Sequence, residues 1–309
     1  MLHLAMRVLF FCFILLLTNL AYAQSPGMNA APSSSVHAPK LTLTLRKSRQ
    51  SPSDLEVGGE LEGLPAGTTG FLTRDDLLAL PRVDFNVTGD TNFADSTRIT
   101  GVRLEELAKR IAAAPTSALA VAICDDKYRA NYPRAYLAAH HPVLVLTVNG
   151  QPPAGWPKDS QEHKYDMGPY MISQANFLPA FKILSHSDEP QIPWGVVRLE
   201  FRNEKTVFGS IAPRGAHTTD AAVQAGYRIA SQNCFKCHNS GAEGGQKSGV
   251  TWAVLAAMAE ATPEDFRAYI RNPISKNPQA QMPGNPSYDD AAIGALTAYF
   301  QTFRSAAKP

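Results

Sequence analysis

Five consecutive residues, Cys234-Phe235-Lys236-Cys237-His238, have the types and spacing needed to hold a metalloporphyrin. Two thiols in a C-x-x-C-H pattern can add to the two vinyl groups of a haem, and the adjacent imidazole is then placed under the iron as an axial ligand. The alternatives are a chance C-x-x-C beside a histidine and a zinc site. Zinc would need two further ligands at matching spacing, and none follows. The motif therefore favours one covalent haem c bound by Cys234, Cys237 and His238, and it favours electron transfer as the chemistry.

The first 23 residues have the pattern of a secretory signal peptide. Arg7 supplies positive charge, an apolar run extends over 8–17, and Ala21-Tyr22-Ala23 forms an A-x-A cleavage site. The apolar run is shorter than the ~20 residues of a membrane span, so a membrane anchor is the weaker interpretation. We expect the mature chain to begin near Gln24 and to have no transmembrane segment after signal cleavage.

Length, charge and cysteine count limit the class of protein. The chain has 309 residues, a length typical of about two domains. Its formal net charge of +2 gives no sign of a nucleic-acid-binding surface. Cys12 leaves with the signal peptide and the two motif cysteines are assigned to haem, so only Cys124 remains. We expect no internal disulfide, and we interpret Cys124 as a small buried hydrophobic residue.

The residue pattern predicts a multidomain chain. Residues 24–40 are rich in Ser, Pro, Ala and Gly and predict a flexible leader. Residues 41–210 mix alternating and helical patterns, which is typical of an α+β domain. Residues 211–218 are interpreted as a linker, and 219–305 as an all-α domain.

Individual elements can also be predicted. Thr73 is expected to open a short helix, Thr262 is expected to cap a helix that ends near Asn272, and Ser287 with Asp290 resembles a capping box for the last helix. The expected strands are 41–45, 83–87, 119–124, 143–148 and 194–201.

Residues 216–305 resemble a class I cytochrome c domain. The likeness follows the order of the parts: Gly226-Tyr227 on a first helix, the C-x-x-C-H motif, Tyr269 to Pro273, the loop Gln281-Met282-Pro283-Gly284, and Tyr299-Phe300 on the last helix. The resemblance implies that the first and last helices cross at Gly226. It also implies insertion of haem in the bacterial periplasm and redox partner proteins there or in the respiratory chain.

A second axial ligand must come from outside the C-x-x-C-H motif. Met282 is the best candidate because it lies in a Pro/Gly-rich loop that can hold a thioether on iron. Met258 is the runner-up, and the alternative for Met282 is simple packing against the ring. Ligation by His238 and Met282 would leave no open position on the iron and would favour outer-sphere electron transfer.

The region from about 70 to 200 resembles the molybdopterin-binding domain of the sulfite oxidase family. The likeness rests on three stretches, 101–107, 124–130 and 144–152. The family holds molybdenum through a cysteine thiolate that precedes the first of these stretches, and here residues 84–100 contain no cysteine. Hydroxyl side chains such as Ser96 are poorer soft ligands. The departure predicts a domain without molybdenum that binds a partner or a small molecule.

Three functions are compatible with these patterns. The first is a periplasmic mono-haem cytochrome whose α+β domain is non-catalytic. The second is a molybdenum-dependent dehydrogenase, with Cys124 or an oxygen ligand on the metal, that oxidises a small anion such as sulfite and passes electrons to the haem. In the third, the α+β domain has a purely structural role within a membrane-bound respiratory complex.

Overall fold

The computed structural model describes residues 43–158, 166–175, 177 and 189–303. The predicted signal peptide and leader lie outside these residues, as do the first two residues of the expected strand at 41–45. Residues 43–45 do not form a strand, and Arg46 makes a single bridge to Phe71. The described residues all fall within one compact unit that spans 41–309.

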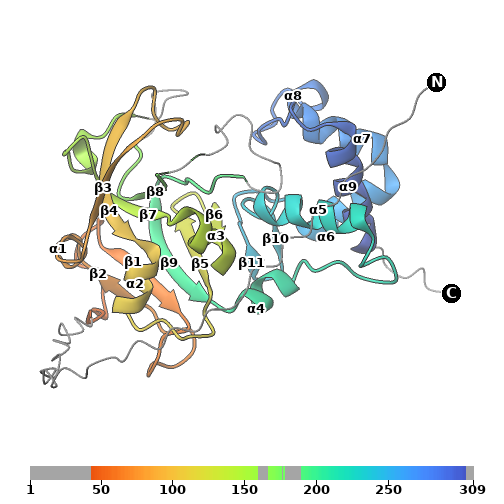
Figure 1. The fold of residues 1–309 in the computed structure, drawn as a ribbon. Helices are drawn as coiled ribbons and strands as arrows, with labels where there is room; N and C mark the ends of the chain where they lie inside the picture. Colours follow the sequence, from red (N-terminus) through yellow and green to blue (C-terminus); the bar gives the residue numbers. More distant parts are fainter. Residues whose placement is uncertain (1–42, 159–165, 176, 178–188, 304–309) are drawn as a thin grey trace, which may run out of the picture. The chain divides into compact units, whose positions relative to one another are not determined.

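A five-stranded sheet with the order β2-β1-β9-β5-β6 forms the centre of the α+β region (Figure 1). Neighbouring strands are antiparallel except for the parallel pair β1 and β9. The apolar sequence of β5 is almost continuous because hydrophobic side chains on both of its faces are buried. The strands are β1 (Leu55–Gly59), β2 (Gly70–Leu72), β5 (Leu119–Cys124), β6 (Arg129–Tyr132) and β9 (Val196–Arg202).

A second sheet has four antiparallel strands in the order β3-β4-β7-β8. Its strands are β3 (Val83–Val87), β4 (Thr97–Arg103), β7 (Val143–Val148) and β8 (Met171–Ser173). Gly101 lies where β4 changes register against β7, and a Cβ atom at this position would lie 2.2 Å from the carbonyl oxygen of Leu144. Only glycine therefore fits at this point of the sheet. The strands predicted at 83–87, 119–124 and 143–148 are confirmed.

Short helices connect the strands of this region. Thr73 begins the first helix as predicted, because its side chain and that of Asp76 form a reciprocal capping box. Buried aliphatic side chains from both sheets and from α2 form one hydrophobic core that also contains Tyr132 and Tyr170. The helices are α1 (Arg74–Leu78), α2 (Leu104–Arg110), α3 (Arg134–His140), η1 (Pro153–Gly155) and α4 (Glu204–Gly209).

The C-terminal region is mainly helical, drawn from cyan to blue in Figure 1. It departs from an all-α fold at one point, where β10 (Asn239–Ser240) and β11 (Glu243–Gly244) form a small hairpin directly after the C-x-x-C-H motif. Its helices are α5 (Ala221–Gln232), α6 (Trp252–Ala261), α7 (Pro263–Arg271), α8 (Pro273–Lys276), α9 (Asp290–Phe300) and η3 (Gln301–Phe303).

The capping predictions in this region had different outcomes. Thr262 takes the N-cap position of α7 as expected, but its side chain makes no capping hydrogen bond and its hydroxyl donates to the carbonyl oxygen of Met258 instead. The capping box predicted from Ser287 and Asp290 is wrong. Asp289 is the N-cap residue of α9, and its carboxylate accepts a hydrogen bond from the backbone N–H of Ala292 at 2.8 Å. A carboxylate one residue before the helix satisfies the free N–H groups directly, so the serine is not needed.

Helices α5 and α9 cross at Gly226. A Cβ atom on Gly226 would lie 2.0 Å from the carbonyl oxygen of Ala295 and 2.6 Å from the Cβ of Tyr299. Tyr299 and Phe300 are fully buried beside this crossing. The close approach expected at Gly226 is therefore present. It holds α5, whose C-terminal end leads into the C-x-x-C-H motif, against α9.

The α+β and helical regions share a hydrophobic core. Leu119 and Val121 of β5 pack in the same cluster as Phe235 and Trp252. Ile211 is also fully buried there, and its carbonyl oxygen accepts a hydrogen bond from the Tyr299 hydroxyl at 2.5 Å. The division into domains at 41–210 and 219–305 stays a prediction. Among the described residues, no helix has both the length and the apolar character needed to cross a bilayer.

Candidate functional site

The C-x-x-C-H motif forms a tight turn at the end of α5. Backbone N–H groups of Cys237 and His238 donate to the carbonyl oxygen of Cys234, at 3.2 and 3.0 Å. Both thiols are partly exposed, whereas the intervening Phe235 is fully buried in the core. The turn therefore keeps the two cysteines partly exposed, while the segment between them is anchored by an aromatic side chain.

Burial shifts the ionisation of the cysteine side chains. It raises the pKa of Cys234 to about 12, and it also raises the pKa of Cys237. Both groups are consequently held as neutral thiols at neutral pH in the folded chain. Thiols of this kind are the groups from which two thioether bonds to a porphyrin are made.

The imidazole of His238 is held in one orientation. The ring is only 8% exposed, and its Nδ1 donates a hydrogen bond to the carbonyl oxygen of Val250 at 2.6 Å. This bond places the proton on Nδ1 and leaves a lone pair on Nε2. Burial also lowers the pKa of His238, so the neutral ring that binds metal is favoured. The donor set of two thiols and one oriented neutral imidazole fits a haem.

Met282 lies in the loop between α8 and α9, which is tied to α7. The backbone N–H and the side-chain amide of Asn285 both donate to the carbonyl oxygen of Ile270, each at 3.1 Å. Met282 is half-buried and packs against the hydrophobic cluster that Cys234 also contacts. Met258 on α6 is likewise half-buried against this cluster. Both methionines thus pack against the cluster that contains Phe235 of the motif, and the choice of Met282 as the second ligand stays a prediction.

The β5–β6 hairpin of the α+β region contacts the motif through its backbone. The N–H of Arg129 donates to the carbonyl oxygen of Lys236 at 2.9 Å, and the N–H of Gln246 donates to the carbonyl oxygen of Lys127 at 3.0 Å. The ammonium group of Lys247 bonds the carboxylate of Asp126 at 2.5 Å. More than 100 residues separate the two sides of these contacts, so no local pattern could have indicated them.

An ion-pair network continues this contact. Glu243 of β11 accepts a hydrogen bond from the guanidinium of Arg202 on β9 at 2.6 Å, and Arg129 lies 3.8 Å from its other oxygen. Arg202 also pairs with Glu200, which is 7% exposed. The hairpin that follows the C-x-x-C-H motif is therefore fastened to the central sheet by charge as well as by the backbone.

Cys124 and the histidines form no second metal site in the described part of the chain. Cys124 is 4% exposed in the core of the α+β region, and burial raises the pKa of its thiol well above the usual value. His140 ends α3 and His141 follows it in the left-handed conformation. His217 is exposed and bonds Asp220. No group of three or more His, Cys, Asp or Glu suited to hold a metal ion occurs among the described residues.

Comparison with known proteins supports part of this description. Residues 221–300 match the family model described as cytochrome C oxidase, cbb3-type, subunit III. No curated protein matches the chain.

Among solved structures, the chain is similar to the crystal structure of the sulfane dehydrogenase SoxCD from Paracoccus pantotrophus. The identity is 15% and the TM-score 0.34, and the match covers 51% of this chain and 40% of that chain. A likeness this distant carries no conclusion about cofactor or activity. The family match does: the chain carries a cytochrome c domain at 221–300, and such a domain implies haem c as its cofactor.

Proposed function

We propose that this chain is a periplasmic mono-haem cytochrome c that transfers one electron at a time between redox partner proteins. The observation that carries the proposal is the hydrogen bond from His238 Nδ1 to the carbonyl oxygen of Val250 at 2.6 Å. It fixes a neutral imidazole, with a lone pair on Nε2, one residue after the second of two partly exposed cysteines. The family match over 221–300 supports the same function.

The residues of the site have distinct roles in this proposal. Cys234 and Cys237 would hold the porphyrin by thioether bonds, and His238 and Met282 would bind the iron. Haem iron with a histidine and a methionine ligand cycles between two oxidation states, and methionine raises its reduction potential. Iron bound by both side chains would favour electron transfer over binding of oxygen or substrate.

In the same proposal, the α+β region is non-catalytic and binds a partner or a ligand. Its β5–β6 hairpin and the ion pairs of Glu243 support the haem motif from outside the cytochrome domain. The buried, protonated thiol of Cys124 supports the absence of a molybdenum ligand there, because molybdenum would require the thiolate at an accessible position. The export signal predicted at residues 1–23 and the cytochrome domain support a periplasmic location.

The proposal is tested on the full mature chain purified from a host that attaches haem c. We expect one haem per chain that stays bound after extraction with acidified acetone, a reversible one-electron couple, and no stoichiometric molybdenum. Replacement of both Cys234 and Cys237 by alanine should allow the haem to be extracted, while Cys124→Ala should leave attachment unchanged.

Two results would overturn the proposal. Protein that emerges colourless, or whose haem is extracted from the unmodified chain, removes the redox centre. Near-stoichiometric molybdenum together with reduction of the haem by sulfite would instead establish the dehydrogenase function.

A further inference from the structure

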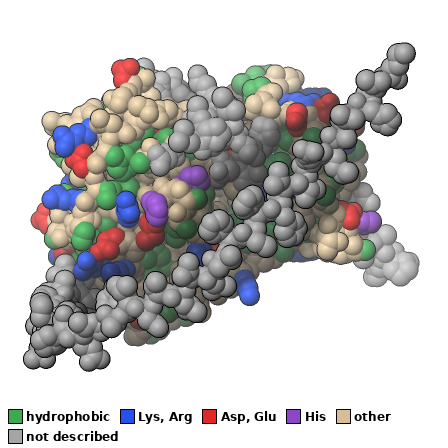
Figure 2. Space-filling view, viewed as in Figure 1, with side chains coloured by type: hydrophobic (Ala, Val, Ile, Leu, Met, Phe, Trp, Pro, Cys, Tyr) green, Lys and Arg blue, Asp and Glu red, His purple; other side chains and the backbone are tan. Residues whose placement is uncertain are grey.

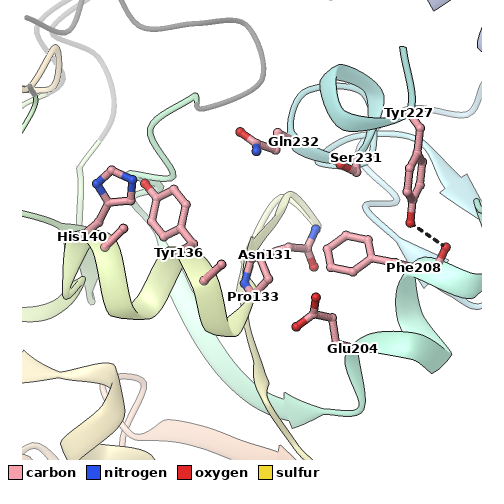
Figure 3. A pocket seen from close by; sticks show the side chains of 11 residues that line it. Asn131, Pro133, Tyr136, His140, Glu204, Phe208, Tyr227, Ser231 and Gln232 are labelled. Atoms are coloured by element: carbon pink, nitrogen blue, oxygen red, sulfur yellow. Dashed lines mark hydrogen bonds between the residues drawn. The ribbon is translucent and has the colours of Figure 1, made fainter. Parts of the chain in front are cut away.

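A pocket of about 410 Å³ lies where the α+β region meets helix α5 (Figure 3). One wall comes from β6 and α3, and the other comes from α4 and α5. Figure 3 shows Asn131, Glu204 and Phe208 together at one end of the pocket, with Tyr136 and His140 along α3 at the other. The pocket is separate from the C-x-x-C-H turn, although it shares helix α5 with it.

Asn131 is the most informative residue of this pocket. Its side chain is 7% exposed, and its Nδ2 is buried with no hydrogen-bond partner among the described residues. A buried N–H donor without an acceptor is destabilising, and buried donors in folded proteins are rarely left in this state. The amide lines the pocket, so the acceptor it requires can be an oxygen atom of a bound molecule.

Glu204 places a negative charge near this amide. Its carboxylate is half-buried and forms no ion pair with any described residue; it accepts a long hydrogen bond from the backbone N–H of Arg134 at 3.5 Å. Glu204 does not cap α4 either, because the side chain of Asn203 accepts from the first free N–H groups of that helix. The carboxylate is therefore available to pair with a cation in the pocket.

Aromatic rings complete the lining on the same side. Phe208 is half-buried, and the hydroxyl of Tyr227 donates to the Phe208 carbonyl oxygen at 3.4 Å, which turns the phenol group away from Asn131. The faces of phenylalanine and tyrosine attract cations through their ring quadrupoles. A carboxylate beside aromatic rings favours an organic cation over an anion or a neutral sugar.

From these contacts we infer that the pocket binds a small organic ammonium compound that also carries an oxygen acceptor, with the cation on Glu204 and the oxygen on Asn131. The inference rests on the proposed role of the α+β region as a ligand-binding module, and it names the site and the ligand class. Ser231 and Gln232 line the pocket three and two residues before Cys234, respectively. An occupant would consequently contact the last turn of the helix that ends at the haem motif.

The test uses three probes of similar size on the full-length haem protein. γ-Aminobutyramide has both the ammonium group and the carbonyl oxygen, butyramide lacks the charge, and butylammonium lacks the oxygen. Isothermal titration calorimetry should show saturable binding of γ-aminobutyramide, with each of the other probes at least about tenfold weaker.

Two variants localise the binding, and a third is their control. Glu204→Gln removes the charge and keeps the shape, and Asn131→Leu removes the donor in a similar volume; each should weaken γ-aminobutyramide at least about tenfold. Glu62→Gln changes an exposed carboxylate outside the pocket and should leave binding unchanged. The haem spectrum of each variant reports that it has folded.

Absence of saturable binding by γ-aminobutyramide would overturn this inference, and so would equal binding by the unmodified protein and both pocket variants. Reversible reduction of the haem is measured in the same samples. If the haem cycles and no probe binds, the proposed electron transfer stands and only the pocket assignment is lost. If a probe binds to protein whose haem does not cycle, the pocket assignment stands and the proposed electron transfer is lost.

Discussion

The backbone N–H of Arg129 donates a hydrogen bond of 2.9 Å to the carbonyl oxygen of Lys236, in the middle of the C-x-x-C-H motif. Arg129 is the first residue of β6, at the edge of the five-stranded sheet. The haem-binding turn is therefore bonded directly to a sheet formed by residues far away in the sequence. This contact makes the α+β region part of the structural support of the site.

Loss of the Glu243 ion pairs should weaken that support. Glu243→Gln removes the charge that Arg202 and Arg129 share, and leaves their guanidinium groups partly buried without a carboxylate at this position. We expect the free energy of unfolding to fall by about 1–3 kcal/mol. Chemical denaturation followed by far-ultraviolet circular dichroism and by haem absorbance measures the change.

Asp265→Asn is the matched control for this variant. It breaks the pair between Asp265 and Lys276, whose side chains are 64% and 45% exposed, so the expected loss is below about 1 kcal/mol. Equal losses in the two variants would show that the Glu243 network adds nothing beyond an ordinary surface pair.

Gly226→Ala tests the crossing of α5 and α9. The added methyl group meets the backbone of Ala295 at 2.0 Å, and backbone cannot move aside as a flexible side chain can. The two helices must separate, and we expect a loss of about 1–3 kcal/mol or more in the free energy of unfolding, together with a disturbed haem spectrum.

Gly294→Ala, on α9, is not expected to lower the free energy of unfolding. No atom lies within 4 Å of the Cβ that this substitution adds, and alanine is favoured over glycine inside a helix by about 0.5–1 kcal/mol. Gly294→Ala should be neutral or stabilising. A destabilised Gly294→Ala beside an unaffected Gly226→Ala would contradict the observed packing.

Sequence predictions succeeded where the interactions involved join residues that are close together in the sequence. Local patterns were sufficient for β3, β5 and β7 and for the capping of α1 by Thr73, because hydrophobic alternation and capping act within a few residues. The cap of α9 was misplaced because Asp289 and Ser287 lie close together and both can accept the same hydrogen bonds.

Some residues of the candidate site could likewise be predicted from the sequence, and others could not. The sequence indicates two thiols and an imidazole, since their adjacency is itself the signal. It does not indicate Val250 as the partner of His238, nor Asn131 and Glu204 as neighbours in one pocket. These pairings depend on tertiary contacts, and Asn131 is simply a polar residue within a strand until the fold places α4 and α5 opposite it.

Asp90 should make stability fall as pH rises. Burial raises the pKa of its carboxyl above the usual value, although the Ser173 hydroxyl donates to it at 2.6 Å. The folded chain therefore holds this proton at pH values where the unfolded chain has released it. The contribution to stability is complete below the unfolded pKa, and it is lost as pH rises from there through the folded pKa.

Comparison of Asp90→Asn with the unmodified protein isolates this effect. The difference between their free energies of unfolding, measured from acid to neutral pH, should change in favour of the variant as pH rises. Asp84 gives the reverse sign, because the Arg98 guanidinium lowers the pKa of its carboxyl, and its contribution is lost as pH falls. Parallel pH profiles for Asp90→Asn and the unmodified protein would refute the raised pKa.

Met282→Ala tests the proposed second axial ligand. Methionine raises the reduction potential of histidine-ligated haem iron, so its loss should lower the potential and remove the thioether-to-iron charge-transfer band.

Met258→Ala is the matched control because both methionines are half-buried against the same hydrophobic cluster. It should cost stability through lost packing, about 2–5 kcal/mol at most, and should leave the band in place. Redox titration and visible absorption spectra of both variants provide the measurement. A band that disappears in Met258→Ala and persists in Met282→Ala would transfer the ligand role to α6, and the loop between α8 and α9 would then only cover the porphyrin.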